Sequence, residues 1–260
     1  TKPIIDNSDP FSALAFRFFF VALGFYLFSA FTKQSIIIKQ KHIIESLFSG
    51  VLFHGLYLGG VFYSISIGMP TGIAALIVTL QPVLTNALSG PLLGEKVTLK
   101  QWAGVLLGFI GAVLVLGFDI GSKIPLLGLI ATIVALMSIT ASTIWQKKLS
   151  NNLSLPVSNF YQAIGGCIFH ILIIIFFSKP YIEFTETFLV AMGHQIFLVS
   201  FGAFTILMFL IKKNSASKTV SIFFLIPATS AFMAWLFLNE SLTNLDLIGF
   251  LIATMGVYIA

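Results

Sequence analysis

Nine apolar runs follow one another along the chain, each close to the roughly 20 residues that a helix needs to cross a bilayer. They lie at residues 11–31, 46–66, 71–92, 102–118, 126–146, 157–178, 188–211, 219–238 and 245–260. The connections between them are short and hold most of the charged residues. This pattern predicts an all-α polytopic protein whose main partner is the lipid bilayer.

The composition excludes the soluble classes of protein. Of the 260 residues, 58% are hydrophobic and 9% are charged, whereas soluble domains carry about 25% charged residues. The mean hydropathy is +1.03. Nucleic acid is excluded as a partner, because Arg17 is the only arginine and no basic cluster with aromatic residues faces water. Cys167 is the only cysteine, so no intrachain disulfide can form.

Motifs for catalysis are absent from the sequence. It contains no H-E-x-x-H, no G-x-S-x-G, no phosphate-binding glycine loop and no Cys/His ligand set. We therefore predict that the chain is not an enzyme and holds no cofactor or metal.

The distribution of charge between the two sides of the membrane predicts the orientation. One set of loops holds ten lysines and two glutamates, and the other holds three lysines and seven acidic residues. Lysine and arginine concentrate in cytoplasmic loops. We predict an integral protein of a bacterial inner membrane with these Lys-rich loops in the cytoplasm: 32–45, 93–101, 147–156 and 212–218.

An internal repeat relates residues 80–118 to residues 225–260 at an offset of 145. Both segments contain a proline-interrupted apolar helix, then [GN]-E-x-x-T, then a glycine-bearing apolar helix. The matching pairs are Leu80 and Leu225, Pro82 and Pro227, Gly94 and Asn239, Glu95 and Glu240, Thr98 and Thr243, Gly104 and Gly249, and Gly111 and Gly256. An offset of 146 extends the similarity to Asp9-Pro10 and Leu155-Pro156.

The repeat predicts two halves of opposite topology, as in many secondary transporters. The loop with Glu95 is predicted to be cytoplasmic, and the loop with Glu240 is predicted to be external. Residues 125–260 supply five helices and residues 1–118 supply four. We expect the partner of 126–146 to lie upstream of Thr1, which gives ten helices in the native chain.

These motifs resemble the EamA family of the drug/metabolite transporter superfamily. The resemblance rests on L-Q-P-V from Leu80, G-E-K-V-T-L-K-Q-W-A-G from Gly94, their echo around Pro227 and Glu240, and D-P with A-F-R-F from Asp9 to Phe18. It implies two inverted five-helix repeats, 1–118 and 125–260, the first lacking its first helix. It also implies a central cavity lined by 46–66, 71–92, 188–211 and 219–238, and transport of small polar metabolites.

Polar side chains inside the runs are the candidates for substrate contact, because such groups are costly in a membrane. His54 and Tyr57 lie near the middle of 46–66 and share a helix face. They are predicted to line the cavity, where a titratable ring and a phenol suit a polar or aromatic ligand. The alternative is a hydrogen bond between helices, since Gly55 and Gly59 permit close packing.

Gln81, Pro82 and Pro227 form the second group of candidates. A proline removes a backbone donor and frees a carbonyl one turn back, and such backbone is tolerated at membrane depth where it lines a cavity. We predict that both prolines shape the cavity by kinking their helices and that Gln81 contacts substrate. A kink that only affects packing is the alternative.

Other residues are assigned to gating or to structure. His194, Gln195 and Trp235 lie toward the external side, as a gate or as interfacial residues. Glu95 and Glu240 are predicted to hold their turns through backbone N–H groups, and Gly104 and Gly249 to permit helix packing. The Gly104-x-x-x-Gly108 pair is also a candidate homodimer contact.

The sequence as a whole predicts secondary-active transport by alternating access, in which one half rocks against the other around a site of His54, Tyr57 and Gln81. The preferred cargo is an amino acid or a similar metabolite, moved outward. Transport of a nucleoside, nucleotide sugar or S-adenosylmethionine-type compound is the alternative, and a non-transporting membrane scaffold is the alternative of another class. Histidines within the runs allow proton coupling.

Overall fold

The computed structural model describes residues 1–117, 124–149, 153–238 and 243–260, which are helical apart from their connections and one antiparallel β-bridge between Ser8 and Ile182. The chain divides into two compact units. Unit 1 comprises Thr1–Met69 and Pro125–Lys213, and unit 2 comprises Pro70–Ile124 and Asn214–Ala260. Each unit therefore takes helices from both halves of the sequence.

Unit 1 contains three long helices, α2, α8 and α9, and two segments interrupted by π-helix. Its elements are α1 (Lys2–Ile5), α2 (Pro10–Phe31), α3 (Gln40–Gly50), the π-helix η1 (Val51–Leu58), α4 (Gly59–Ser66), α8 (Leu126–Leu149), α9 (Leu155–Phe177), α10 (Glu186–His194), the π-helix η2 (Gln195–Ala203) and α11 (Phe204–Lys213).

Unit 2 contains two broken segments and two continuous helices. Its elements are α5 (Thr71–Val78), α6 (Gln81–Leu93), α7 (Leu99–Leu116), α12 (Ala216–Ser221), the 3-10 turn η3 (Ile222–Phe224), α13 (Leu225–Leu238) and α14 (Asn244–Ile259).

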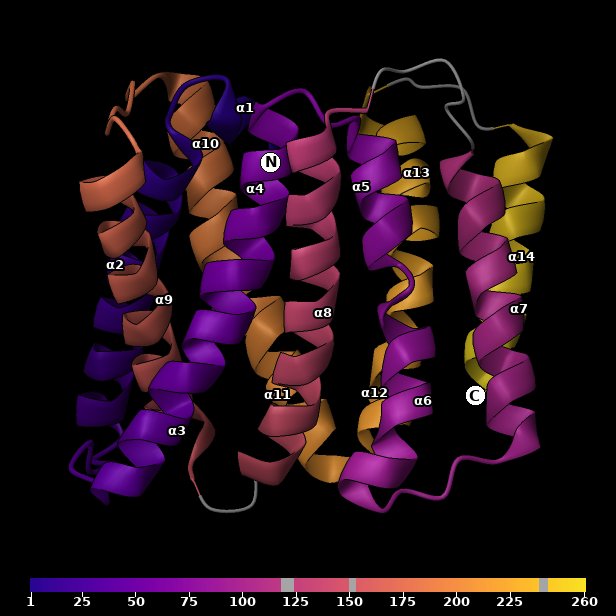
Figure 1. Ribbon diagram of the computed structural model, residues 1–260, viewed down its shortest axis with the longest axis horizontal. Coiled ribbons are helices and arrows are strands. Elements are labelled where there is room, and N and C mark those ends of the chain that lie inside the picture. Colours follow the sequence, from indigo (N-terminus) through magenta and orange to yellow (C-terminus); the bar gives the residue numbers. More distant parts are fainter. Residues whose placement is uncertain (118–123, 150–152, 239–242) are drawn as a thin grey trace. The chain divides into compact units, whose positions relative to one another are not determined.

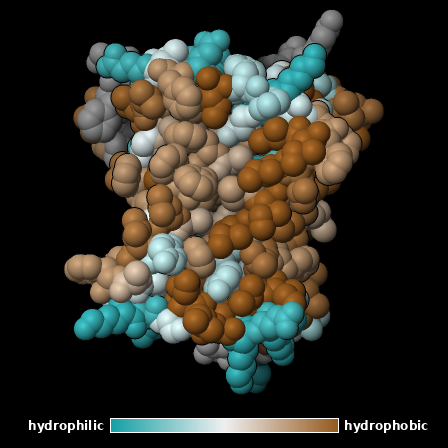
Figure 2. Space-filling model, turned by 90° about the vertical axis from the view of Figure 1, so that its left-hand side faces the viewer, coloured by the Kyte–Doolittle hydropathy of each residue, from teal (hydrophilic) through white to brown (hydrophobic). Residues whose placement is uncertain are grey.

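Seven helical segments of the described chain are long and apolar enough to cross a membrane. They are Pro10–Phe31, Gln40–Ser66, Thr71–Leu93, Leu99–Leu116, Leu126–Leu149, Leu155–Phe177 and Glu186–Lys213. The run at 219–238 falls in α12, η3 and α13, and the run at 245–260 forms the shorter apolar helix Asn244–Ile259. Figure 2 shows apolar side chains across the middle of the face that carries α2 and α9, with hydrophilic residues at both ends. The all-helical membrane fold is confirmed.

Side-chain caps fix where several helices begin. The Asp9 carboxylate accepts a hydrogen bond from the backbone N–H of Ser12 at 2.8 Å, just before Pro10 opens α2. Thr98 and Gln101 form a capping box at α7, and Thr243 and Asp246 form the matching box at α14. Such caps satisfy donors that have no partner within the helix.

The helix boundaries repeat at the offset found in the sequence. Helices α2, α4, α5 and α7 begin 145 residues before α9, α11, α12 and α14, respectively. The two π-helices also correspond, because η1 begins 144 residues before η2. The internal similarity therefore extends from sequence motifs to helix boundaries and helix type.

Helices α7 and α14 are repeat mates, and they pack side by side through glycines (Figure 1). A Cβ atom added at Gly104 would lie 2.6 Å from the carbonyl oxygen of Gly256, and one at Gly111 would lie 2.6 Å from that of Gly249. Since low residue numbers in α7 meet high numbers in α14, the helices run antiparallel. The two contacts are equivalent under the internal repeat. Gly104 corresponds to Gly249 and Gly111 to Gly256, so the repeat converts the Gly104–Gly256 contact into the Gly249–Gly111 contact.

The glycine stripe of α7 is covered within the chain itself. Gly104 packs against Gly256 and Ala260, and Gly108 packs against the Phe224 ring. The Gly104-x-x-x-Gly108 pair was also a candidate homodimer contact. That candidate is wrong, because the surface in question is buried by α14 and η3.

Helices α2 and α9, the corresponding mates in unit 1, also pack antiparallel. Asp9 at the start of α2 accepts a hydrogen bond from Ser178 at the end of α9. Further along, the rings of Phe18 and His170 lie 6.1 Å apart, and at the other end those of Tyr26 and Phe160 lie 5.9 Å apart.

We predict that Gly104→Ala lowers the free energy of unfolding by about 1–3 kcal/mol, the usual cost of overpacking. The added methyl group would meet backbone atoms of α14, which cannot rotate away. Gly72→Ala is the matched control in the same unit, since its Cβ would have nothing within 4 Å. Unfolding in mixed detergent micelles measures both, and equal stability of the two variants would contradict the prediction.

Candidate substrate-binding site

His54 and Tyr57 lie in η1, one of the two π-helices of unit 1. A π-helix is rare and is frequently found at functional sites. The His54 side chain is 3% exposed, and its ring lies 4.3 Å from that of Phe18 and 4.7 Å from that of Phe204. Its Nδ1 has no hydrogen-bond partner among the described residues. Tyr57 is half-buried, and its ring contacts Phe53 at 5.3 Å.

His170 connects α9 to this π-helix. Its ring is fully buried, and Nε2 lies 3.0 Å from the backbone carbonyl oxygen of His54. Because a carbonyl oxygen only accepts, Nε2 carries the proton in this hydrogen bond. Gly59 lies against the ring, where a Cβ would be 3.1 Å from Cε1. A hydrogen bond between helices was the alternative role for the His54 side chain. The structure has such a bond at this residue, but it is accepted by the His54 backbone carbonyl and donated by His170.

Arg17 makes the corresponding connection from α2 to η2. Its side chain is 4% exposed, and Nε donates a hydrogen bond to Ser200 Oγ at 3.0 Å. The Ser200 hydroxyl in turn donates to the carbonyl oxygen of Gln195 at 3.1 Å. Each π-helix is thus held by one polar side chain from a long helix, His170 of α9 for η1 and Arg17 of α2 for η2.

Gln81, Pro82 and Pro227 belong to unit 2. The helix that would join α5 to α6 is interrupted at Thr79 and Leu80, and α6 restarts at Gln81 with Pro82 in its first turn. A proline is tolerated there because its missing N–H would have no helical partner. In the other half, η3 is a 3-10 turn that leads into α13, where Pro227 is the third residue. All three side chains are buried.

Glu95 lies against the start of α12. Its carboxylate accepts hydrogen bonds from the backbone N–H groups of Ala216 at 2.8 Å and Ser217 at 3.3 Å. The Ser217 hydroxyl donates to the amide oxygen of Asn86. The carboxylate therefore caps a helix from the other half of the sequence as well as following α6. Glu240 lies outside the described residues.

The candidate gate residues are not gathered in one place by the described contacts. His194 ends α10 and is exposed, while Gln195 opens η2 and is half-buried. Trp235 lies in α13, and its side chain is outside what the structure describes. Gly249 packs against Gly111 in unit 2.

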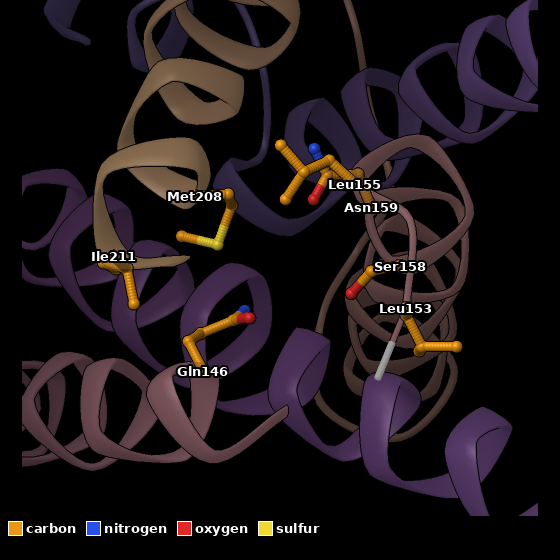
Figure 3. Close-up of a pocket in the computed structure, with 7 residues that line it drawn as sticks. All are labelled: Gln146, Leu153, Leu155, Ser158, Asn159, Met208 and Ile211. Atoms are coloured by element: carbon orange, nitrogen blue, oxygen red, sulfur yellow. The ribbon is translucent and has the colours of Figure 1, made fainter. Parts of the chain in front are cut away.

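A small pocket lies where α8 ends and α9 begins (Figure 3). Asn159 is 1% exposed, and neither atom of its amide group has a partner among the described residues. Beside it, Gln146 and Gln162 pair through their amides, and Gln162 donates to Ser158 Oγ at 2.9 Å. The pocket is lined by Gln146, Leu153, Leu155, Ser158, Asn159, Met208 and Ile211.

The sequence shows that Arg17 is the only arginine, but nothing in the sequence connects it with η2. One sequence signal did point to Arg17, because an arginine within a membrane span is a functional candidate by default. Within the described ranges, no three His, Cys, Asp or Glu side chains come together as metal ligands would.

Comparison with known proteins identifies the family to which this helical architecture belongs. The family described as "EamA-like transporter family" matches residues 1–117 and 126–260. The chain is 27% identical to the "Uncharacterized transporter YvbV" of Bacillus subtilis, covering 83% of this chain and 70% of that protein. It is 23% identical to a "Probable amino-acid metabolite efflux pump" of Escherichia coli, covering 98% and 86%.

A solved crystal structure has the same fold, with a TM-score of 0.79 at 17% identity, over 96% of this chain and 87% of that one. The helical membrane fold and the matched family define an integral membrane transport protein, not an enzyme. The chain belongs to the EamA-like transporter family of the drug/metabolite transporter superfamily.

We predict that His170→Phe lowers the free energy of unfolding by about 1 kcal/mol, the typical net value of one hydrogen bond. An aromatic ring is retained at this position, while the donor to the His54 carbonyl oxygen is lost. His42→Phe is the matched control, because among the described residues His42 pairs with Glu45 alone, at the partly exposed start of α3. If His170→Phe unfolds like the wild type, the bond between α9 and η1 contributes nothing to stability.

Proposed function

We propose that the protein is a secondary-active exporter of amino acids or similar small polar metabolites. Family membership and the printed function of the Escherichia coli relative support this class of cargo. A relative from Salmonella typhimurium, 23% identical over 98% of this chain, carries the same printed function. The observation that carries the mechanism is the correspondence of broken and π-helical segments between the two halves.

We further propose inverted EamA-type repeats, residues 1–118 and 125–260, with nine spans in this chain and the Lys-rich loops in the cytoplasm of a bacterial inner membrane. The antiparallel packing of α2 with α9 and of α7 with α14 supports the inversion. Repeats of this kind allow a site at mid-membrane to open alternately to either side.

The bodies that move are proposed to differ from the sequence halves. A rocking of one half against the other would separate α7 from α14 and α2 from α9. The backbones of α7 and α14 are in close contact through glycines. We therefore propose moving bodies that keep each mated pair intact, in place of rocking halves.

We propose that His54, Tyr57 and Gln81 contact the cargo and that Pro82 and Pro227 shape their helices for it. The unpaired Nδ1 of His54 supports a role for this ring, since a buried polar atom without a partner is costly. His54 and His170 lie next to each other at the η1 carbonyl, so they are the candidates for proton coupling.

Solute counterflow in proteoliposomes, with the full-length protein and a panel of labelled amino acids and nucleosides, tests the function. We expect flux of amino acids, and we expect His54→Ala and Gln81→Ala to reduce it about tenfold or more, equivalent to 1.4 kcal/mol of binding. His42→Ala is the matched control and should transport normally. An imposed pH gradient that changes the flux would support proton coupling.

Three outcomes would contradict parts of this proposal. Flux of nucleosides alone would favour the alternative cargo class. No flux of any compound by folded protein, together with a stable stoichiometric partner, would favour a scaffold. Normal flux in both variants would exclude His54 and Gln81 from the site.

A further inference from the structure

Arg17 is a buried cation whose charge no described residue neutralises. It follows Pro10 by seven residues, which places it about 10 Å along the α2 axis from the start of the helix. No carboxylate oxygen of the described chain lies within 4.0 Å of its guanidinium. Ser200 accepts a hydrogen bond from Nε, and no described residue accepts one from either Nη atom.

This arrangement is costly unless a ligand completes it. A guanidinium is charged at every physiological pH and presents five N–H donors in a rigid fork. Burial of a single charge without a counterion costs several kcal/mol. A neutral donor would be enough for the bond to Ser200, so the charge itself needs an explanation.

The fork is oriented by the groups around it. Nε is used by Ser200, whose own proton is committed to the Gln195 carbonyl oxygen, so the hydroxyl is fixed as an acceptor. The guanidinium carbon also lies 5.2 Å from the centre of the Phe18 ring. The pair of Nη atoms is left, and two parallel N–H groups are the geometry that binds the two oxygens of a carboxylate.

The charge balance selects the ligand class. Arg17 is the only arginine, and the described lysines lie in connections or within the first or last three residues of a helix. A phosphate group carries more charge than one guanidinium neutralises, whereas a carboxylate carries one. The side chains of histidine and tyrosine, such as His54 and Tyr57 of η1, carry no negative charge at neutral pH.

We propose that Arg17 binds the carboxylate of the transported solute through its Nη atoms and that Ser200 is the positioning residue that orients the fork. The proposal rests on the proposed function, because it assigns the group by which the exporter recognises its cargo. Amino acids and other monocarboxylates fit this site, and their amides and esters do not.

Binding to the purified full-length protein tests the site without requiring transport. The probes are sodium butyrate and butyramide, with sodium chloride added to equal ionic strength, and the readout is the thermal unfolding temperature. Butyrate should raise this temperature in the wild type, because a ligand that binds only the folded state stabilises it. Butyramide should not, and neither compound should stabilise Arg17→Gln.

Counterflow provides the second readout. For the amino acid with the largest flux, the free acid should compete about tenfold or more better than its amide, and the ratio should fall to about 1 in Arg17→Gln. Arg17→Lys keeps the charge but loses the fork, so an intermediate ratio is expected and this variant serves if Arg17→Gln does not fold. Ser200→Ala should also lower the ratio. Lys41→Gln, which removes an exposed charge, should leave it unchanged.

The outcomes separate the two proposals. An acid-to-amide ratio that stays at its wild-type value in folded Arg17→Gln would overturn the carboxylate site and leave the exporter intact, as would equal stabilisation of both proteins by butyrate. Stabilisation by butyrate that depends on Arg17, without flux of any compound, would support the site and count against the exporter.

Discussion

The close approach of antiparallel repeat mates is the constraint on which the rest of the structure depends. In unit 2, the backbones of α7 and α14 meet where glycine removes the side chain from both partners. In a bilayer, water does not drive helices together, so close backbone contact and van der Waals packing must supply the attraction. The same antiparallel pairing of α2 with α9 places Arg17 and His170 inside unit 1.

With the mated pairs fixed, the polar side chains they carry act on the irregular segments beside them. Arg17 reaches η2 through Ser200, and His170 reaches η1 through the His54 carbonyl oxygen. A π-helix departs from the hydrogen-bond pattern of its neighbours and often marks a functional position. The regular helices of unit 1 therefore hold its irregular ones, which also carry His54 and Tyr57.

The helical fold could be predicted from the sequence because apolar runs of membrane length have few other structures available. The interruption before Pro82 also followed from local chemistry, since a proline lacks the backbone donor. The π-helices could not be predicted, because their hydrogen-bond pattern has no signature in composition. The repeat identified equivalent residues such as Gly104 and Gly249. Equivalent residues need not touch each other, and Gly104 packs against Gly256. For the same reason Arg17 could not be connected with Ser200, which lies 183 residues away.

The interleaving of the halves has a consequence for the order of assembly. Synthesis proceeds from the N-terminus, so α2 and α7 enter the membrane before α9 and α14 exist. Until then, the glycine stripe of α7 faces lipid or a neighbouring chain, and Arg17 has no Ser200 beside it. Neither unit can be completed by the first half alone, and the sixteen-residue helix α14 is required to cover α7. A nascent chain of this type cannot cover the glycine stripe of α7 until α14 has been synthesised, so removal of α14 would be more disruptive than its length suggests.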